Sequence, residues 1–158
     1  MLASRVTSRL RFPVGGRVAL LLLTTLAFSA CGGSSPSGPD VTLTPIAPVD
    51  GVLTVRAFEW GFEPGAIALR QGEEVRIVLV NDGEILHNLK VEDLAADVIE
   101  ANSSGPLSGD EGELFVGAAA GDEGTLVFVP QGSGSFTFYC TISDHRQLGM
   151  EGPLTVEP

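Results

Sequence analysis

Short runs of β-forming residues, each bounded by turn residues, constrain the fold of this chain more than any other feature. From Gly51 onward the runs are rich in Val, Ile, Leu, Thr and Phe, and Gly, Pro, Asn and Asp separate them. In several runs apolar and polar side chains alternate, which gives a strand one buried and one wet face. Eight strands are predicted: Val52–Phe58, Ala66–Arg70, Glu74–Asn81, Leu86–Glu92, Glu113–Ala118, Thr125–Val129, Ser135–Cys140 and Gly152–Glu157.

About eight short strands separated by turns predict an all-β fold, a two-sheet antiparallel sandwich of the Greek-key type. The 158 residues of the chain suffice for one ordinary core, so one domain is expected, over residues 51–158. The stretch 93–112 interrupts the β pattern. It contains LAADVIE, which could form one or two helical turns, and then a run rich in Ser, Gly and acidic residues. A loop or short helix insert is therefore expected there.

The first 50 residues have the composition of an export signal followed by a linker. Four arginines precede the apolar run Val18–Phe28, which is shorter than the roughly 20 residues needed to span a bilayer. The run ends in FSAC, which resembles the bacterial lipobox. Residues 1–31 are thus predicted to be a lipoprotein signal peptide with Cys31 as the lipidation site, and simple secretion is the alternative. Residues 32–50, rich in Gly, Ser and Pro, are predicted to be a flexible tether.

These segments predict an exported protein, lipid-anchored to the outer face of a bacterial membrane, in the periplasm or at the cell surface. The part after Cys31 holds all 20 acidic residues but only five of the nine Lys and Arg, a formal net charge of −15. Such a surface repels nucleic acid and attracts basic partners over a distance. Nucleic-acid binding is therefore excluded, and a partner protein with a basic docking surface is expected.

One loop near the C-terminus carries three residues that suit a metal. Cys140, His145 and Met150 follow one another with four residues in each gap, between two predicted strands. The only other histidine in the chain is His87, at one end of a predicted strand. Two His, one Cys and a weak axial Met are the ligands of blue-copper electron-transfer sites. These four residues are therefore predicted to bind one copper ion.

Each of these residues also has a plain structural explanation, because a lone Cys is usually a small buried hydrophobic residue and a lone Met fills a gap. The combination favours a metal, since no other Cys, His or Met follows Cys31. Three functions stay open: electron transfer, copper delivery or sequestration, and an enzyme with a Cys nucleophile activated by His. The enzyme is disfavoured, because no Asp or Asn that would orient the histidine is identifiable and Met150 would have no role.

The sequence resembles the cupredoxin family of small blue-copper electron carriers over roughly Val52–Val156. The resemblance is carried by FEWGFEPGAIALRQGEEVRIVLVN, by HN at His87, by FTFYC before the loop and by MEGPLTV after it. The loop spacing is most similar to the auracyanin and rusticyanin types. The resemblance implies a monomeric electron carrier with one type 1 copper. Both histidines would bind through an imidazole nitrogen, Cys140 through a short thiolate bond and Met150 as the weak axial ligand.

The same resemblance implies roles for residues that lie next to the ligands in the sequence. Asn88 matches the position that joins the two ligand loops. Ser143 and Asp144 stand where many relatives have Pro-Gly before the second histidine. A carboxylate at Asp144 would favour Cu(II) and lower the reduction potential, while Arg146 would partly offset it.

Apolar side chains near the ligands are expected to keep water off the metal and to form the patch on which a partner docks, with His145 as the electron's exit. Ordinary core positions are the alternative. The expected patch comprises Ile85, Leu86, Ile142 and Leu148.

Overall fold

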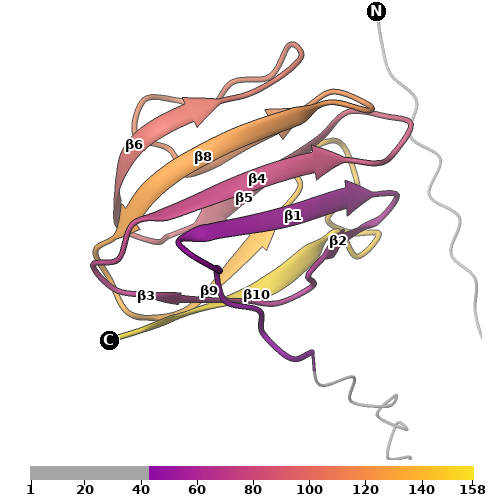
Figure 1. Ribbon diagram of the computed structural model, residues 1–158. Helices are drawn as coiled ribbons and strands as arrows, with labels where there is room; N and C mark the ends of the chain where they lie inside the picture. Colours follow the sequence, from indigo (N-terminus) through magenta and orange to yellow (C-terminus); the bar gives the residue numbers. More distant parts are fainter. Residues whose placement is uncertain (1–42) are drawn as a thin grey trace, which may run out of the picture. The chain divides into compact units, whose positions relative to one another are not determined.

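The computed structural model describes residues 43–158, which fold into two facing β-sheets (Figure 1). The predicted signal peptide, Cys31 and most of the predicted tether lie outside these residues. No helix in the described part is long and apolar enough to cross a membrane. The strands are β1 (Val52–Phe58), β2 (Gly61–Glu63), β3 (Ile67–Arg70), β4 (Val75–Asn81), β5 (His87–Glu92), β6 (Ala96–Asn102), β7 (Phe115–Ala118), β8 (Glu123–Pro130), β9 (Gly134–Tyr139) and β10 (Glu151–Glu157).

One sheet has the strand order β2-β1-β4-β8-β6 and the other β3-β10-β9-β5-β7, so the predicted all-β sandwich is confirmed. Its sheets are mixed rather than wholly antiparallel, because β1 pairs with β4 and β10 with β3 in the parallel sense. The first of these pairings has a topological cause. The chain leaves the first sheet after β2, forms β3 in the opposite sheet and returns as β4 in the direction of β1.

Residues 93–112 contain a strand in place of the expected helical turns. β6 pairs antiparallel with β8, with a register shift between Val98 and Glu100. It is an edge strand, and many of its side chains face solvent, so its sequence lacks the apolar content that marks the inner strands. Backbone pairing with β8 therefore overrides the weak local preference of LAADVIE. The rest of the insert, after Asn102, is a loop as expected.

The last residues of the predicted tether (32–50) pair with the domain. Ile46 forms an isolated parallel bridge with Ile67, and Val49 an antiparallel one with Val52. The Ile46 N–H donates to the Ala66 carbonyl, and the Ala68 N–H donates to the Ile46 carbonyl, each at 3.0 Å. Because β3 is an edge strand, its free backbone groups can take up this segment.

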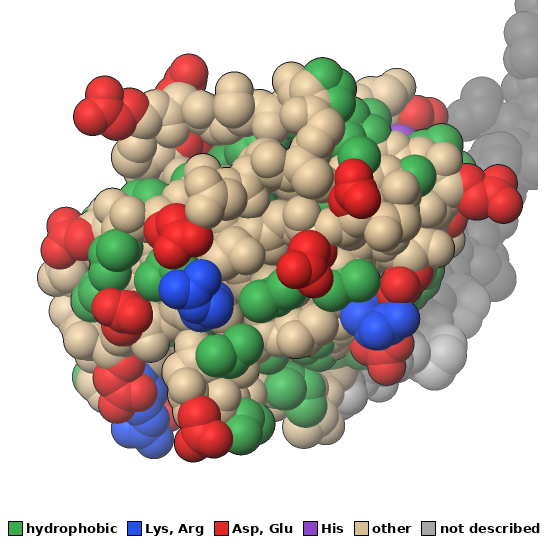
Figure 2. All heavy atoms as spheres, turned by 45° about the horizontal axis from the view of Figure 1, so that its top comes forward, with side chains coloured by type: hydrophobic (Ala, Val, Ile, Leu, Met, Phe, Trp, Pro, Cys, Tyr) green, Lys and Arg blue, Asp and Glu red, His purple; other side chains and the backbone are tan. Residues whose placement is uncertain are grey.

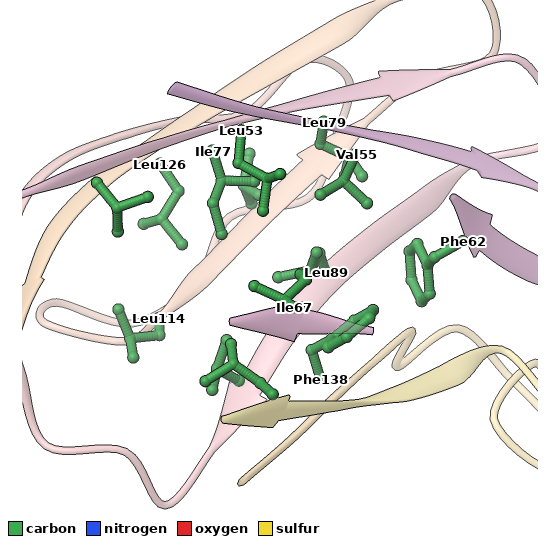
Figure 3. Packing of buried hydrophobic residues seen from close by; sticks show 14 of the residues in the cluster. Leu53, Val55, Phe62, Ile67, Ile77, Leu79, Leu89, Leu114, Leu126 and Phe138 are labelled. Carbon is green, nitrogen blue, oxygen red and sulfur yellow. The ribbon is translucent and has the colours of Figure 1, made fainter. Parts of the chain in front are cut away.

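The hydrophobic core fills the space between the two sheets (Figure 3). Along β4 every second side chain is buried, including Ile77 and Leu79, and the facing sheet supplies Leu89 and Phe138. Since a shift of one residue would turn these side chains outward, the alternation fixes the register of the strand. The result is a rigid scaffold whose strand ends can hold functional groups in defined positions.

Replacement of Ile77 by Ala should lower the free energy of unfolding by about 2–5 kcal/mol, because the side chain is completely buried in the centre of a sheet. Ile99→Ala on β6 is the matched control. Its side chain is 58% exposed, so the change should stay within about 0.5 kcal/mol. Urea unfolding of the copper-free protein measures both, and equal losses would contradict this location of the core.

Candidate metal centre

His87, Cys140 and His145 meet at one end of the sandwich. One ligand atom from each lies within 4.8 Å of the others. The Sγ atom of Cys140 is 3.5 Å from Nδ1 of His145, and the two imidazole centroids are 5.1 Å apart. His87 begins β5 and Cys140 follows the last residue of β9, and these two strands are antiparallel neighbours. Strand pairing therefore brings together ligands that are distant in the sequence.

Backbone hydrogen bonds of the loop between β9 and β10 bring Met150 to the same place. The Cys140 N–H donates to the Met150 carbonyl, and the Met150 N–H donates to the His145 carbonyl, each at 3.0 Å. Met150 is fully buried and directly precedes β10. Cys140, His145 and Met150, which are equally spaced in the sequence, thus lie close together because backbone hydrogen bonds close the loop. The location of Met150 suits the axial role predicted for it, and that role stays a prediction.

The chemistry of the donor groups fits a copper ion. Both ring nitrogens of His87 are buried, and neither has a hydrogen-bond partner in the described part of the chain. An unpaired buried donor or acceptor costs about 1–3 kcal/mol, and a bond to a metal would remove that cost for one nitrogen. Burial lowers the pKa of His87, which keeps a lone pair free for a metal. Two imidazoles, one thiol and one thioether are a soft donor set of the kind that copper prefers.

The Cys140 thiol is also buried, and it is free. Burial raises the pKa of this thiol, because an isolated thiolate is poorly stabilised away from water. A bound cation would supply the missing stabilisation and would release the thiol proton. The site is thus better suited to a thiolate with a metal than to a thiolate alone.

Asn88 fastens the two ligand segments to each other. Its Nδ2 donates to Oγ1 of Thr141, and the Thr141 N–H donates to Oδ1 of Asn88, each at 2.9 Å. Asn88 follows His87, and Thr141 follows Cys140. The two bonds therefore fix the separation of these ligands, which is the arrangement that the family resemblance implied for Asn88.

Asp144 and Arg146 flank His145. The Asp144 side chain is exposed, and its carboxylate has no hydrogen-bond or ion-pair partner within residues 43–158. Arg146 donates to Glu92 at 3.2 Å and to Glu151 at 2.8 Å, and its guanidinium lies 3.9 Å from the ring centroid of Tyr139. Because two carboxylates balance the guanidinium, Arg146 is better placed to tie down the loop than to offset Asp144. The effect of Asp144 on the potential stays a prediction.

Glu59 and Trp60 were not predicted from the sequence. Both lie in the turn between β1 and β2, close to the yellow loop that joins β9 to β10 (Figure 1). Trp60 packs edge-on against His145, with ring centroids 4.9 Å apart, and Oε1 of Glu59 lies 3.6 Å from Nε2 of His87. No local pattern links this turn to the ligands, because the contacts arise only when the two sheets face each other.

Asn81 was not predicted either. Its Nδ2 donates to the carbonyls of Ile85 and Ala118 at 2.7 and 2.8 Å, and its Oδ1 accepts from the Gly83 N–H at 2.9 Å. These bonds hold the loop that leads into His87. The sequence signal that could have revealed this role is a polar Asn at the end of the apolar strand EVRIVLVN, and the structure shows that this Asn is buried.

The predicted apolar patch divides into two kinds of residue. Ile85 and Leu148 are exposed, whereas Leu86 and Ile142 are half-buried, and Ile142 packs against the core. His145 is only 4% exposed, while Trp60 beside it is 42% exposed. A partner that approaches His145 from solvent would therefore meet Trp60 as well.

The variant Asn88→Ala should lower the free energy of unfolding by about 1–3 kcal/mol, since it removes two hydrogen bonds worth about 0.5–1.5 kcal/mol each. It should also speed hydrogen exchange at the Thr141 amide. Urea unfolding and exchange NMR of the copper-free protein check both effects. Asn102→Ala is the control, because within residues 43–158 that side chain bonds only the half-buried Glu100. Unchanged exchange at Thr141 would show that Asn88 does not join the two segments.

Known proteins with similar sequences agree with this geometry. Residues 49–157 match the family described as copper binding proteins of the plastocyanin/azurin family. Two relatives are each named copper-resistant cuproprotein CopI. The protein of Rubrivivax gelatinosus is 34% identical over 99 residues, which cover 60% of this chain and 59% of the relative. That of Pseudomonas aeruginosa is 29% identical over 173 aligned positions, which cover 89% of this chain and 96% of the relative.

Similar solved structures include two auracyanins and one oxidase. Auracyanin B has a TM-score of 0.52 and 22% identity, over 73% of this chain and 91% of its own. The auracyanin of Roseiflexus castenholzii has a TM-score of 0.55 and 16% identity, over 70% and 100%. The multicopper oxidase of Campylobacter jejuni has a TM-score of 0.54 and 14% identity, over 73% and 31%. At these identities the likeness shows the fold alone.

The family match spans most of the chain and all four predicted ligands, and the structure places a buried His-Cys-His cluster within it. The chain therefore belongs to the plastocyanin/azurin family of copper-binding proteins, the cupredoxins, and copper is its cofactor.

Proposed function

We propose that this protein is an exported, membrane-tethered blue-copper protein that carries one electron at a time between redox partners. The observation that supports this best is the buried convergence of His87, Cys140 and His145, with Met150 joined to the same loop. Copper bound there would supply the exchange of one electron between Cu(II) and Cu(I).

The chain provides a rigid holder for the ligands. A carrier works fastest when its ligands move little between the two oxidation states, and side chains on strands are held more firmly than side chains on free loops. His87 and Cys140 lie at strand ends, and Asn88 ties their segments together. Arg146 bonds the loop to Glu92 of β5 and Glu151 of β10.

The partner we propose is a redox protein with a basic surface, contacted by a monomer of this chain. Acidic side chains are scattered over the face drawn in Figure 2, with few Lys or Arg between them. This charge would steer a basic partner toward the domain. The contact itself would form on exposed apolar side chains near the ligands, which are Phe58, Trp60, Ile85 and Leu148.

Membrane attachment through a lipid at Cys31 is part of the proposal and rests on the signal-like sequence of residues 1–31. The predicted tether after Cys31 would let the domain move between partners near the membrane surface.

A second candidate is copper delivery or sequestration, which the names of the two CopI relatives favour. Exchange of copper with other proteins suits an exposed site rich in Met or His. Here the site is buried, and the chain after Cys31 holds one Met and two His. Electron transfer therefore remains the first proposal. An oxidase activity is not proposed, because a catalytic copper needs further histidines. The one proposed copper site already uses both histidines of the chain.

One equivalent of Cu(II) should turn the purified protein intensely coloured through thiolate-to-copper charge transfer. Cys140→Ser should lose this colour, and Asn102→Ala should keep it. Visible absorption and paramagnetic resonance measure the result. A colourless wild-type complex would refute the proposal, and rapid transfer of copper to a chelator of similar affinity would favour delivery instead.

Leu148→Lys should slow electron transfer to a basic cytochrome c at least tenfold, because it puts a positive charge into the proposed contact. Ile99→Lys makes the same charge change on β6, the edge strand farthest from β2 in its sheet, and should alter the rate much less. Stopped-flow measurements at low salt give both rates. Similar rates for the two variants would place the contact elsewhere.

A further inference from the structure

The carboxylate of Glu59 lies beside the first copper ligand. Its Oε1 is 3.6 Å from Nε2 of His87, slightly longer than a normal hydrogen bond. The imidazole is completely buried, and the Glu59 side chain is 33% exposed. Glu59 is not one of the residues whose ligand atoms gather within 4.8 Å. It therefore stands next to the metal cluster rather than within it.

The protein holds this carboxylate in place. The Glu84 N–H donates to Oε1 of Glu59 at 2.7 Å. Because this hydrogen bond is made to a carboxylate oxygen, it favours the charged form of the side chain. A Cβ at Gly83 would lie only 2.6 Å from Oε1, so glycine leaves the space that the carboxylate fills. The segment before His87 thus forms a cradle for Glu59.

A neutral histidine that binds a metal through one nitrogen carries its proton on the other. That N–H normally donates to a carboxylate or a carbonyl, which fixes the orientation of the ring and raises its basicity as a ligand. In His87 the nitrogen that faces an acceptor is Nε2, and neither ring nitrogen has a hydrogen-bond partner within residues 43–158.

We propose that Glu59 is a positioning residue for His87: in the copper-loaded protein its carboxylate accepts a hydrogen bond from Nε2–H, which fixes the imidazole with Nδ1 turned toward copper. The inference rests on the copper site proposed above and adds a residue to it. A negative charge at this position also stabilises Cu(II) more than Cu(I), so Glu59 lowers the reduction potential.

Three variants separate the contact from the charge. Glu59→Gln removes the charge at the contact. Gly83→Ala keeps every charge but pushes the carboxylate away from its place. Glu84→Gln removes a charge from the adjacent exposed side chain, and it keeps the backbone N–H that holds Glu59.

Glu59→Gln and Gly83→Ala should each lower the affinity for Cu(II) relative to Cu(I) about tenfold, which raises the potential by about 59 mV for one electron. Glu84→Gln should shift it by less than half as much. Protein-film voltammetry measures the potentials. Equal shifts for Glu59→Gln and Glu84→Gln would reduce the effect to general electrostatics and overturn the proposal.

Nitrogen-15 NMR of the diamagnetic Cu(I) protein gives an independent reading. The wild type should show a slowly exchanging Nε2–H for His87, shifted downfield by the carboxylate, and Gly83→Ala should lose that shift. A proton on Nδ1 instead, or loss of the blue colour in Glu59→Gln, would overturn the assignment. Failure of the copper function itself would appear in the wild type, as a colourless Cu(II) complex, whereas failure of this inference appears in the variants of a blue protein.

Discussion

The paired hydrogen bonds between Asn88 and Thr141 are the interaction on which the metal centre depends. The ligands come from two segments more than 50 residues apart, with His87 on one and the loop from Cys140 to Met150 on the other. The pairing of β5 with β9 brings these segments together, but the paired residues end at Lys90 and Tyr139. Asn88 continues the connection beyond that point with its side chain, and this sets the distance between the imidazole and the thiol.

Burial of polar groups at the metal site costs free energy of folding, and the packing of the rest of the domain offsets that cost. Within residues 43–158, two imidazole nitrogens that lack a hydrogen-bond partner and a thiol are buried at one end of the core. Departures from full hydrogen bonding are typical of functional sites, where stability supplied elsewhere tolerates them. Metal binding and folding are then linked, because a ligand that binds only the folded chain stabilises it.

The positions of the inner strands along the chain and the ligand loop could be predicted from the sequence, since both depend on local pattern. The alternation of apolar and polar side chains in β4 predicts one buried face. Three of the four predicted ligands lie in one loop, so their spacing is visible in the sequence. His87 was found by elimination. β6 was not predicted, because an exposed edge strand carries little apolar signal and is specified by pairing with β8. The contacts of Glu59 and Trp60 with the histidines could not be predicted for a different reason. They exist only after the β1–β2 turn packs against the ligand loop.

We infer that His87, Cys140 and His145 bind one copper ion, with Met150 as a weak fourth ligand. X-ray absorption at the copper edge is the decisive experiment, because it counts the bonded sulfur and nitrogen atoms without reference to colour or activity. One short copper–sulfur bond and two copper–nitrogen bonds, with the sulfur bond absent in Cys140→Ser, is the predicted result. Coordination by oxygen and nitrogen alone, or a spectrum that Cys140→Ser leaves unchanged, would contradict it.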